Sequence, residues 1–146
     1  MISYSTRPLV SIWEHTYTGH MPRKSKSRRI VRNRFTGAPL VIKSAEALSW
    51  VNGVILESAK CAIAYDKPVV LIADIYYRSN RSDLSEELLM DALEKGGVIE
   101  NDRLVVGKVI LKHVGPENPR VEVRLFRPED LFPEYAPPAP KRRAKI

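Results

Sequence analysis

The sequence is poor in the features that mark secreted and membrane proteins. Cys61 is the only cysteine among 146 residues, which rules out an internal disulfide framework and fits a reducing cytoplasm. No apolar run approaches the roughly 20 residues that a membrane-spanning helix needs. Residues 1–7 lack the charged-then-apolar order of a signal peptide. We therefore expect a cytoplasmic protein that does not bind a membrane.

Several enzyme signatures are missing as well. The sequence has no phosphate-binding P-loop, no glycine-rich dinucleotide motif, no zinc-finger spacing and no Ser-His-Asp pattern. Its three histidines are not spaced as metal ligands. Nucleotide hydrolysis and hydride transfer therefore have no support in the sequence.

Acidic residues are absent from the whole interval between Glu14 and Glu46. The same interval holds eight cations while the rest of the chain is nearly balanced, so this segment accounts for the net charge of +7. Charge runs are often only solvated, but a field of one sign confined to one segment attracts a polyanion. We therefore predict that the segment binds nucleic acid. The predicted contact residues are Arg23, Lys24, Lys26, Arg28, Arg29, Arg32 and Arg34.

The length and composition predict one compact domain followed by a tail. A content of 44% hydrophobic and 28% charged residues is typical of globular proteins, and the length suits one core. Residues 127–146 hold five of the 11 prolines and end in a basic cluster, so they have little to bury. We expect a domain over 1–126 and an extended or mobile tail over 127–146.

Apolar periodicity places the first elements. Alternation over residues 9–13 predicts a strand, and the basic stretch 20–34 predicts a loop or loose hairpin. Ser44 is a good N-cap for a helix over 44–64. The apolar face expected for that helix is Leu48, Val51, Ile55, Ala59 and Ala62.

The second half of the chain completes the expected sheet. The apolar run at 68–77 predicts a central strand covered on both faces. A second helix is expected over 84–95, and two strands over 104–114 and 121–126. The predicted class is α/β (α+β), with a mixed β-sheet, two main helices and the order β-α-β-α-β-β.

The second predicted helix has an acidic face that points to two different roles. Asp83 followed three residues later by Glu86 is a capping-box spacing, which needs no metal. Asp102 follows the helix in a short connection that can fold back toward it, and converging carboxylates can hold Mg²⁺ for phosphodiester cleavage. On spacing alone, both roles stay open. The acidic face consists of Asp83, Glu86, Glu87, Asp91 and Glu94.

Three short motifs carry a resemblance to a known family. They are Asp-Leu-Ser-Glu at 83–86, Asp-Ala-Leu at 91–93 and Asn-Asp-Arg-Leu-Val at 101–105. They resemble the Asp-Leu-Asp-Asn, Asp-Ala-Leu and Asp-Asp-x-x-Val elements of RusA-type crossover-junction endodeoxyribonucleases. The basic stretch 26–34 is similar to that of phage and prophage members. The likeness covers roughly residues 20–126 and is most specific over 83–105.

The resemblance implies a RusA-like fold and a homodimer that resolves four-way (Holliday) DNA junctions in recombination and repair. It also implies Mg²⁺, or Mn²⁺, as the cofactor. By position, Asp102 matches a catalytic aspartate, and Asn101 stands where many members have another. The implied catalytic residues are Asp83, Asp102, Glu86 and Glu87, and the implied metal ligands are Asp83, Asp91 and Asp102.

Two alignments of the first motif remain open. If Asp83 is the first aspartate of the family pair, Ser85 replaces the second and Glu86 stands at the asparagine. In an ungapped alignment Asp83 is the second, Arg81 replaces the first and Glu87 replaces a functional lysine. Both alignments lack one carboxylate, which Glu86 or Glu87 can supply. A DNA-binding relative without cleavage activity is therefore the main alternative, and an RNA-associated basic protein is a weaker one.

Overall fold

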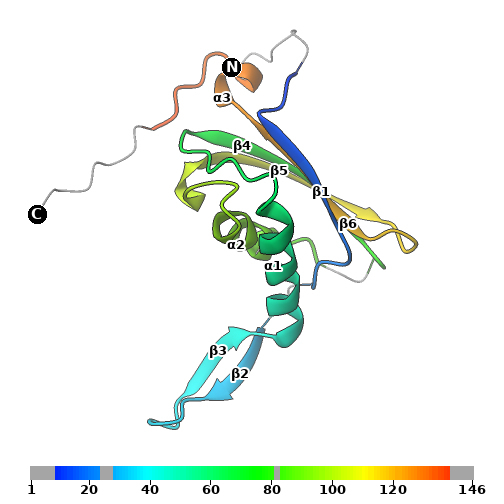
Figure 1. Ribbon diagram of the computed structural model, residues 1–146, viewed down its shortest axis with the longest axis vertical. Coiled ribbons are helices and arrows are strands. Elements are labelled where there is room, and N and C mark those ends of the chain that lie inside the picture. Colours follow the sequence, from blue (N-terminus) through cyan, green and yellow to red (C-terminus); the bar gives the residue numbers. More distant parts are fainter. Residues whose placement is uncertain (1–8, 24–27, 81–82, 139–146) are drawn as a thin grey trace, which may run out of the picture.

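The computed structural model describes residues 9–23, 28–80 and 83–138 (Figure 1). A four-stranded main sheet consists of β1 (Trp13–Thr18), β6 (Arg120–Phe126), β4 (Val69–Tyr77) and β5 (Val105–Val114), in that spatial order. The two main helices are α1 (Ala45–Ser58) and α2 (Glu87–Lys95). The remaining elements are the hairpin strands β2 (Arg28–Arg32) and β3 (Pro39–Lys43), the 3-10 helix η2 (Asp102–Leu104) and the short helix α3 (Pro128–Leu131).

The main sheet is mixed. Strand β6 pairs antiparallel with both β1 and β4, whereas β5 runs parallel to β4. Parallel neighbours need a crossover connection, and α2 with η2 provides it. The predicted α+β class with a mixed sheet is confirmed. When the hairpin is left out, the main elements follow the predicted order.

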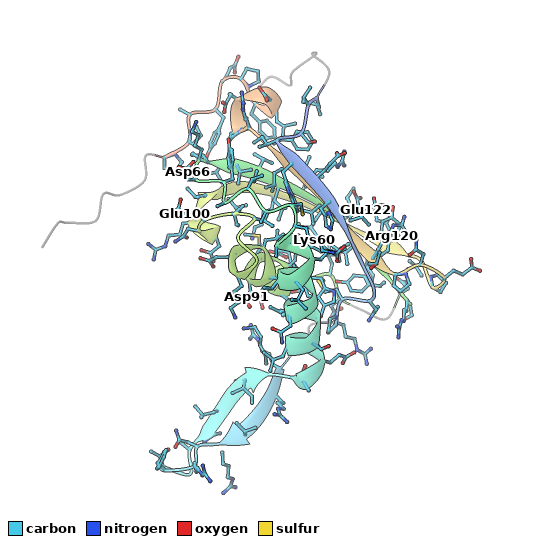
Figure 2. All side chains as sticks on the ribbon, viewed as in Figure 1. Lys60, Asp66, Asp91, Glu100, Arg120 and Glu122 are labelled. Atoms are coloured by element: carbon cyan, nitrogen blue, oxygen red, sulfur yellow. The ribbon has the colours of Figure 1, made fainter. Side chains whose placement is uncertain are left out.

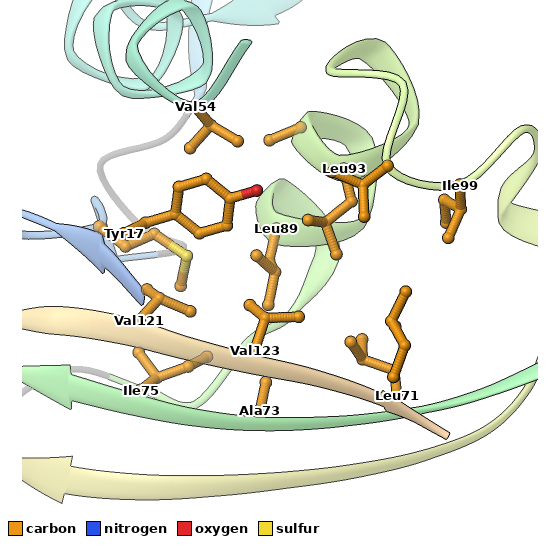
Figure 3. Close-up of a cluster of buried hydrophobic side chains, with 14 of the residues drawn as sticks. Tyr17, Val54, Leu71, Ala73, Ile75, Leu89, Leu93, Ile99, Val121 and Val123 are labelled. Atoms are coloured by element: carbon orange, nitrogen blue, oxygen red, sulfur yellow. The ribbon is translucent and has the colours of Figure 1, made fainter. Parts of the chain in front are cut away.

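The hydrophobic core lies between one face of the sheet and the two main helices (Figure 3). Every second side chain of β4 points into it, from Leu71 and Ala73 to Ile75 and Tyr77, and all are fully buried. Leu89 and Leu93 of α2 meet them from the helical layer (Figure 3). This core fixes the position of α2 and therefore of the acidic side chains on its outer face.

The prediction that β4 is covered on both faces holds only at the start of the strand, where Val70 on the second face is 2% exposed and lines a pocket with Phe132 and Tyr135. Ile72, Asp74 and Tyr76 point to the same second face and are only half-buried, and α1 and α2 both lie on the first face (Figure 1). Asp74 is accommodated there by His113, whose Nε2 lies 2.7 Å from Oδ1, and by Arg124 at 3.7 Å.

The first strand begins where the sequence predicted it to end. Strand β1 starts at Trp13, while Leu9 and Val10 are exposed. The side chains that anchor it are aromatic: Tyr17 is 1% exposed, and the Trp13 indole Nε1–H donates to the carbonyl of Cys61 at 3.0 Å. Antiparallel pairing with β6 therefore sets the bounds of this strand.

Helix α1 starts as expected but ends earlier. The Ser44 side chain accepts a hydrogen bond from the Ala47 amide at 3.1 Å, which caps the helix. The helix ends at Ser58. Farther along, the Ala64 amide donates to the Gly97 carbonyl at 2.8 Å, so the backbone there runs beside the segment after α2. The expected face was partly wrong, since Leu48 is 45% exposed. The residues that α1 buries are Ala47, Val51, Val54 and Ser58. At 14 residues α1 is the longest described helix, and none of the described helices is long and apolar enough to cross a membrane.

Part of the predicted tail is folded onto the domain. Pro128 is buried at the start of α3. Phe132 and Tyr135 line a small apolar pocket of about 180 Å³ together with Val70 and Gly107 of the open sheet face. The expectation that residues after 126 have little to bury is therefore wrong for this stretch, and residues 139–146 lie outside the described part of the chain.

Candidate functional site

The start of α2 differs from the predicted capping box. The helix begins at Glu87, and its N-cap is Glu86, which makes no side-chain capping bond. Asp83 lies four residues before the first helical residue, in irregular structure, with an exposed side chain. The capping-box interpretation is therefore wrong: Asp83 is not the N-cap of the helix, and the Glu86 side chain makes no capping bond.

A short turn after α2 brings Asp102 back toward the helix. The Asn101 side chain accepts a hydrogen bond from the Arg103 amide at 2.8 Å, and the Asn101 carbonyl accepts one from Leu104 at 3.1 Å. These bonds make Asn101 the N-cap of η2 and place Asp102 at its first position. Asn101, which stands where the family motif has another acid, is thus explained by capping.

Five acidic side chains line one pocket of about 420 Å³ between α2, η2 and β5. They are Glu86, Glu87, Asp91, Glu94 and Asp102. Four of these are predicted site residues: Glu86, Asp91 and Asp102 come one from each of the three motifs, and Glu87 follows the first motif. Asp83 does not line the pocket; its backbone carbonyl accepts a hydrogen bond from the Tyr77 hydroxyl at 3.4 Å instead.

Basic side chains already neutralise most of these acids. Arg28 of the hairpin donates to Glu87 at 2.8 Å, and Lys108 of β5 donates to Glu86 at 3.0 Å. The Arg28 and Glu87 side chains are both more than half exposed, so this pair contributes about 1 kcal/mol or less. Such weak pairs can be exchanged for another cation or for a phosphate.

Asp91 has a buried carboxylate oxygen and lies on the side of α2 that the hairpin approaches (Figure 2). Its Oδ2 atom lies 3.0 Å from Lys43 Nζ and 3.2 Å from Lys95 Nζ. The oxygen is buried, and neither contact has the direction of a regular hydrogen bond. Burial alone raises the pKa of Asp91, but the two lysines outweigh it and hold that pKa below the ordinary value. The contact with Asp91 in turn raises the pKa of Lys95.

The oxygen atoms that line the pocket are of the chemical type that binds a hard divalent ion. Carboxylate oxygens are the ligands that Mg²⁺ prefers, and Asp91 contributes a buried oxygen without a regular hydrogen bond. Among the described residues, however, no three carboxylate, imidazole or thiolate groups converge closely enough to hold one ion. Ion binding therefore requires carboxylates to turn away from their basic partners.

The predicted nucleic-acid-binding residues gather on the hairpin next to this pocket. Arg28, Arg29, Arg32 and Arg34 are exposed along β2 and its turn. Arg23 precedes the hairpin and is half-buried, while Lys24 and Lys26 lie outside the described residues.

Two lysines that pair with acids of the pocket, Lys43 and Lys108, were missed in the sequence. Lys43 pairs with Arg28 across the hairpin, so the same side of the arm supplies both cations to α2. The pairing of Arg28 with Lys43 could have been inferred from the sequence by aligning the two strands of a hairpin around its turn. The contact between Lys108 and Glu86 joins residues 22 positions apart, and no spacing in the sequence signals it.

No protein-family model matches the chain, and no curated protein matches it in sequence. Arguments about function therefore depend on the acidic pocket and the basic hairpin.

Proposed function

We propose that the protein is a metal-dependent, structure-selective endonuclease of the RusA type that acts on four-way DNA junctions. One observation carries the proposal: Glu86, Glu87, Asp91 and Asp102 line a single pocket whose wall includes Arg28 of the basic hairpin. A phosphodiester backbone needs cations to hold it and carboxylates to support hydrolysis, and here the two adjoin.

The residues have distinct roles in this proposal. Asp91 and Asp102 would hold Mg²⁺ or Mn²⁺, which when bound lowers the pKa of its water and neutralises charge on the phosphate. Glu86 or Glu87 supplies the carboxylate that the motif lacks. Asp83 joins them only if the irregular segment before α2 moves, because it lies outside the pocket.

The hairpin orients the substrate. Arg28 and Lys43 are the cations nearest the acids, and a phosphate can replace Glu87 or Asp91 as their partner. Arg29, Arg32 and Arg34 continue the basic surface along the arm. A four-way junction presents symmetry-related strands, so two copies of the chain with equivalent sites suit it, and we propose a homodimer.

The test is incubation of the purified protein with a four-way junction, a matched linear duplex and a matched RNA duplex, with and without Mg²⁺. We expect paired nicks in the junction only with Mg²⁺, and little cleavage of either duplex. Absence of cleavage with Mg²⁺ and with Mn²⁺ would overturn the endonuclease proposal. Stronger binding to the RNA would favour an RNA-associated function.

The second candidate is a junction-binding protein without cleavage activity. Two observations favour it: Asp83 lies outside the pocket, and Glu86, Glu87 and Asp91 each have a basic partner. The same experiment separates the candidates, because this one binds the junction in preference to the duplex and leaves it intact with either metal.

A further inference from the structure

The turn at the tip of the hairpin is firmly built. The Asn33 side chain accepts hydrogen bonds from the amides of Phe35 at 2.8 Å and Thr36 at 3.1 Å. The Asn33 backbone pairs with Gly37 at 2.9 Å and with Ala38 at 2.7 Å. Gly37 has φ +68°, a conformation that favours glycine. These bonds fix the backbone of the tip in one conformation.

That fixed turn presents an aromatic ring to solvent. The Phe35 side chain is 93% exposed, the highest exposure of any large hydrophobic residue in the described part of the chain. Single exposed apolar residues are common, but full burial of a phenylalanine is worth about 1.5–3 kcal/mol, so a ring held outward is available to a partner. The hairpin extends away from the rest of the molecule (Figure 1).

The surroundings of Phe35 indicate the chemistry of that partner. Arg32 and Arg34 are exposed three residues and one residue before Phe35, and the whole interval from His15 to Ala45 contains no acid. A ligand that suits an exposed aromatic ring with two exposed arginines close to it in the chain has a flat apolar face and negative charges beside that face. A nucleobase within its phosphate backbone has both.

We propose that Phe35 stacks on a nucleobase exposed at the branch point of DNA while Arg32 and Arg34 contact the phosphates beside it. The inference rests on the proposed nucleic-acid function and adds a branch-reading element to it. Bases inside a continuous duplex are stacked on both sides, whereas bases at a branch can lose a neighbour. A side chain that stacks on a base therefore gains the most binding energy at the branch, whereas phosphate contacts alone do not distinguish a junction from a duplex.

The position of the tip also gives the hairpin a measuring role. Arg28 at the root of β2 lies in the acidic pocket, and Phe35 lies beyond the far end of the same five-residue strand. At about 3.3 Å per residue, the strand separates the two by roughly 15–20 Å. A base held at the tip therefore sets the phosphate that reaches the pocket.

The test compares Phe35→Ala and Phe35→Trp with Ile30→Ala. Ile30 is a matched control because it is also exposed and apolar but lies in the middle of β2. The substrates are a four-way junction and a linear duplex, each with one 2-aminopurine, placed at the branch point in the junction. Affinity, fluorescence, nick position and the mass of the free protein by light scattering are measured.

We expect Phe35→Ala to bind the junction about five- to 100-fold more weakly, with duplex affinity unchanged. It should also lose the fluorescence change at the branch point. Phe35→Trp and Ile30→Ala should behave like the parent. If the parent cleaves, Phe35→Ala should also spread its nicks over neighbouring phosphates.

Three results would overturn the inference. Phe35→Ala could keep the parental preference for junction over duplex, or lose affinity for both equally. It could also fall from dimer to monomer without DNA, which would make a second copy of the chain the partner of the ring. A parent that binds neither substrate would overturn the proposed function as well, so the two failures are distinguishable.

Discussion

Arg28 Nη2 lies 2.8 Å from Glu87 Oε2, and this contact joins the basic hairpin to the helix that bears the acidic pocket. Lys43, opposite Arg28 in the hairpin, reaches Asp91 in the same way. The root of the arm therefore pairs with carboxylates that the proposed reaction also needs. In the proposed reaction, binding a phosphate at the arm would therefore be linked to freeing these carboxylates for an ion.

Neutralising the arm should weaken binding more than it changes folding. Arg28→Ala with Arg29→Ala removes two exposed cations, so junction affinity should fall and the salt dependence of log K should flatten by at most about two units of slope. The matched control is Lys60→Ala with Lys67→Ala. Both lysines lie between α1 and β4, and Lys60 lies at the end of α1 away from the hairpin (Figure 2). Fluorescence anisotropy over a salt series measures both. Equal slopes for the two double variants would place the DNA surface elsewhere.

Much of the fold could be read from the sequence, because local patterns and tertiary structure agree there. Ser44 caps α1 as its type predicts, and Asp102 folds back beside α2 as the short connection predicts. The predictions failed where contacts between residues far apart in the sequence determine the local structure. The Asp83 spacing matched a capping box, but the chain enters α2 through irregular structure and the helix starts only at Glu87.

The sequence predicted which acids belong to the site but not how their side chains are arranged in the pocket. The motifs selected Glu86, Glu87, Asp91 and Asp102, and these share one pocket. The cation that each acid meets depends on how the hairpin and β5 sit against α2, which no local spacing encodes. For that reason the sequence predicted converging metal ligands, whereas Glu86, Glu87 and Asp91 are each paired with a lysine or an arginine.

The buried pair of Tyr17 and Ser58 should affect stability in alkali. Their hydroxyl oxygens lie 2.7 Å apart, and burial raises the pKa of Tyr17 to about 12. The folded chain therefore keeps this proton between pH 10 and 12 while the unfolded chain loses it, so the free energy of unfolding should fall as pH rises above 10. Tyr17→Phe should cost about 1 kcal/mol at pH 7 and weaken that decline. Urea unfolding at pH 7 and 10.5 tests this, and a parallel decline in both proteins would exclude Tyr17 as its source.

Asp91 should contribute stability at neutral pH but not in acid. Its pKa is lowered in the folded chain, so the contribution is complete above its ordinary pKa of 3.8 and is lost as pH falls through the lower folded value. Asp91→Asn leaves Lys43 and Lys95 close together without their anion, and should destabilise the protein by about 1 kcal/mol at pH 7. The difference from the parent should shrink near pH 2–3. A difference that stays constant with pH would show that packing, not charge, accounts for the loss.

Asp102 gives the clearest separation of catalysis from folding. It is exposed at the first position of η2, where Asn101 provides the cap, so Asp102→Asn removes no capping bond and keeps the side-chain shape. If the carboxylate helps to hold Mg²⁺, the amide should remove most metal-dependent cleavage, by about 100-fold or more, since a neutral ligand concentrates less positive charge at the phosphate. Junction affinity should hold or rise, because a negative charge facing the DNA is gone. Glu100→Gln is the matched control, an equal charge change at an exposed residue outside the pocket. If Asp102→Asn cleaves at the rate of Glu100→Gln, Asp102 is not part of the site. If Asp102→Asn unfolds, Asp102 has a structural role, and the second candidate, a junction-binding protein without cleavage activity, becomes the favoured function.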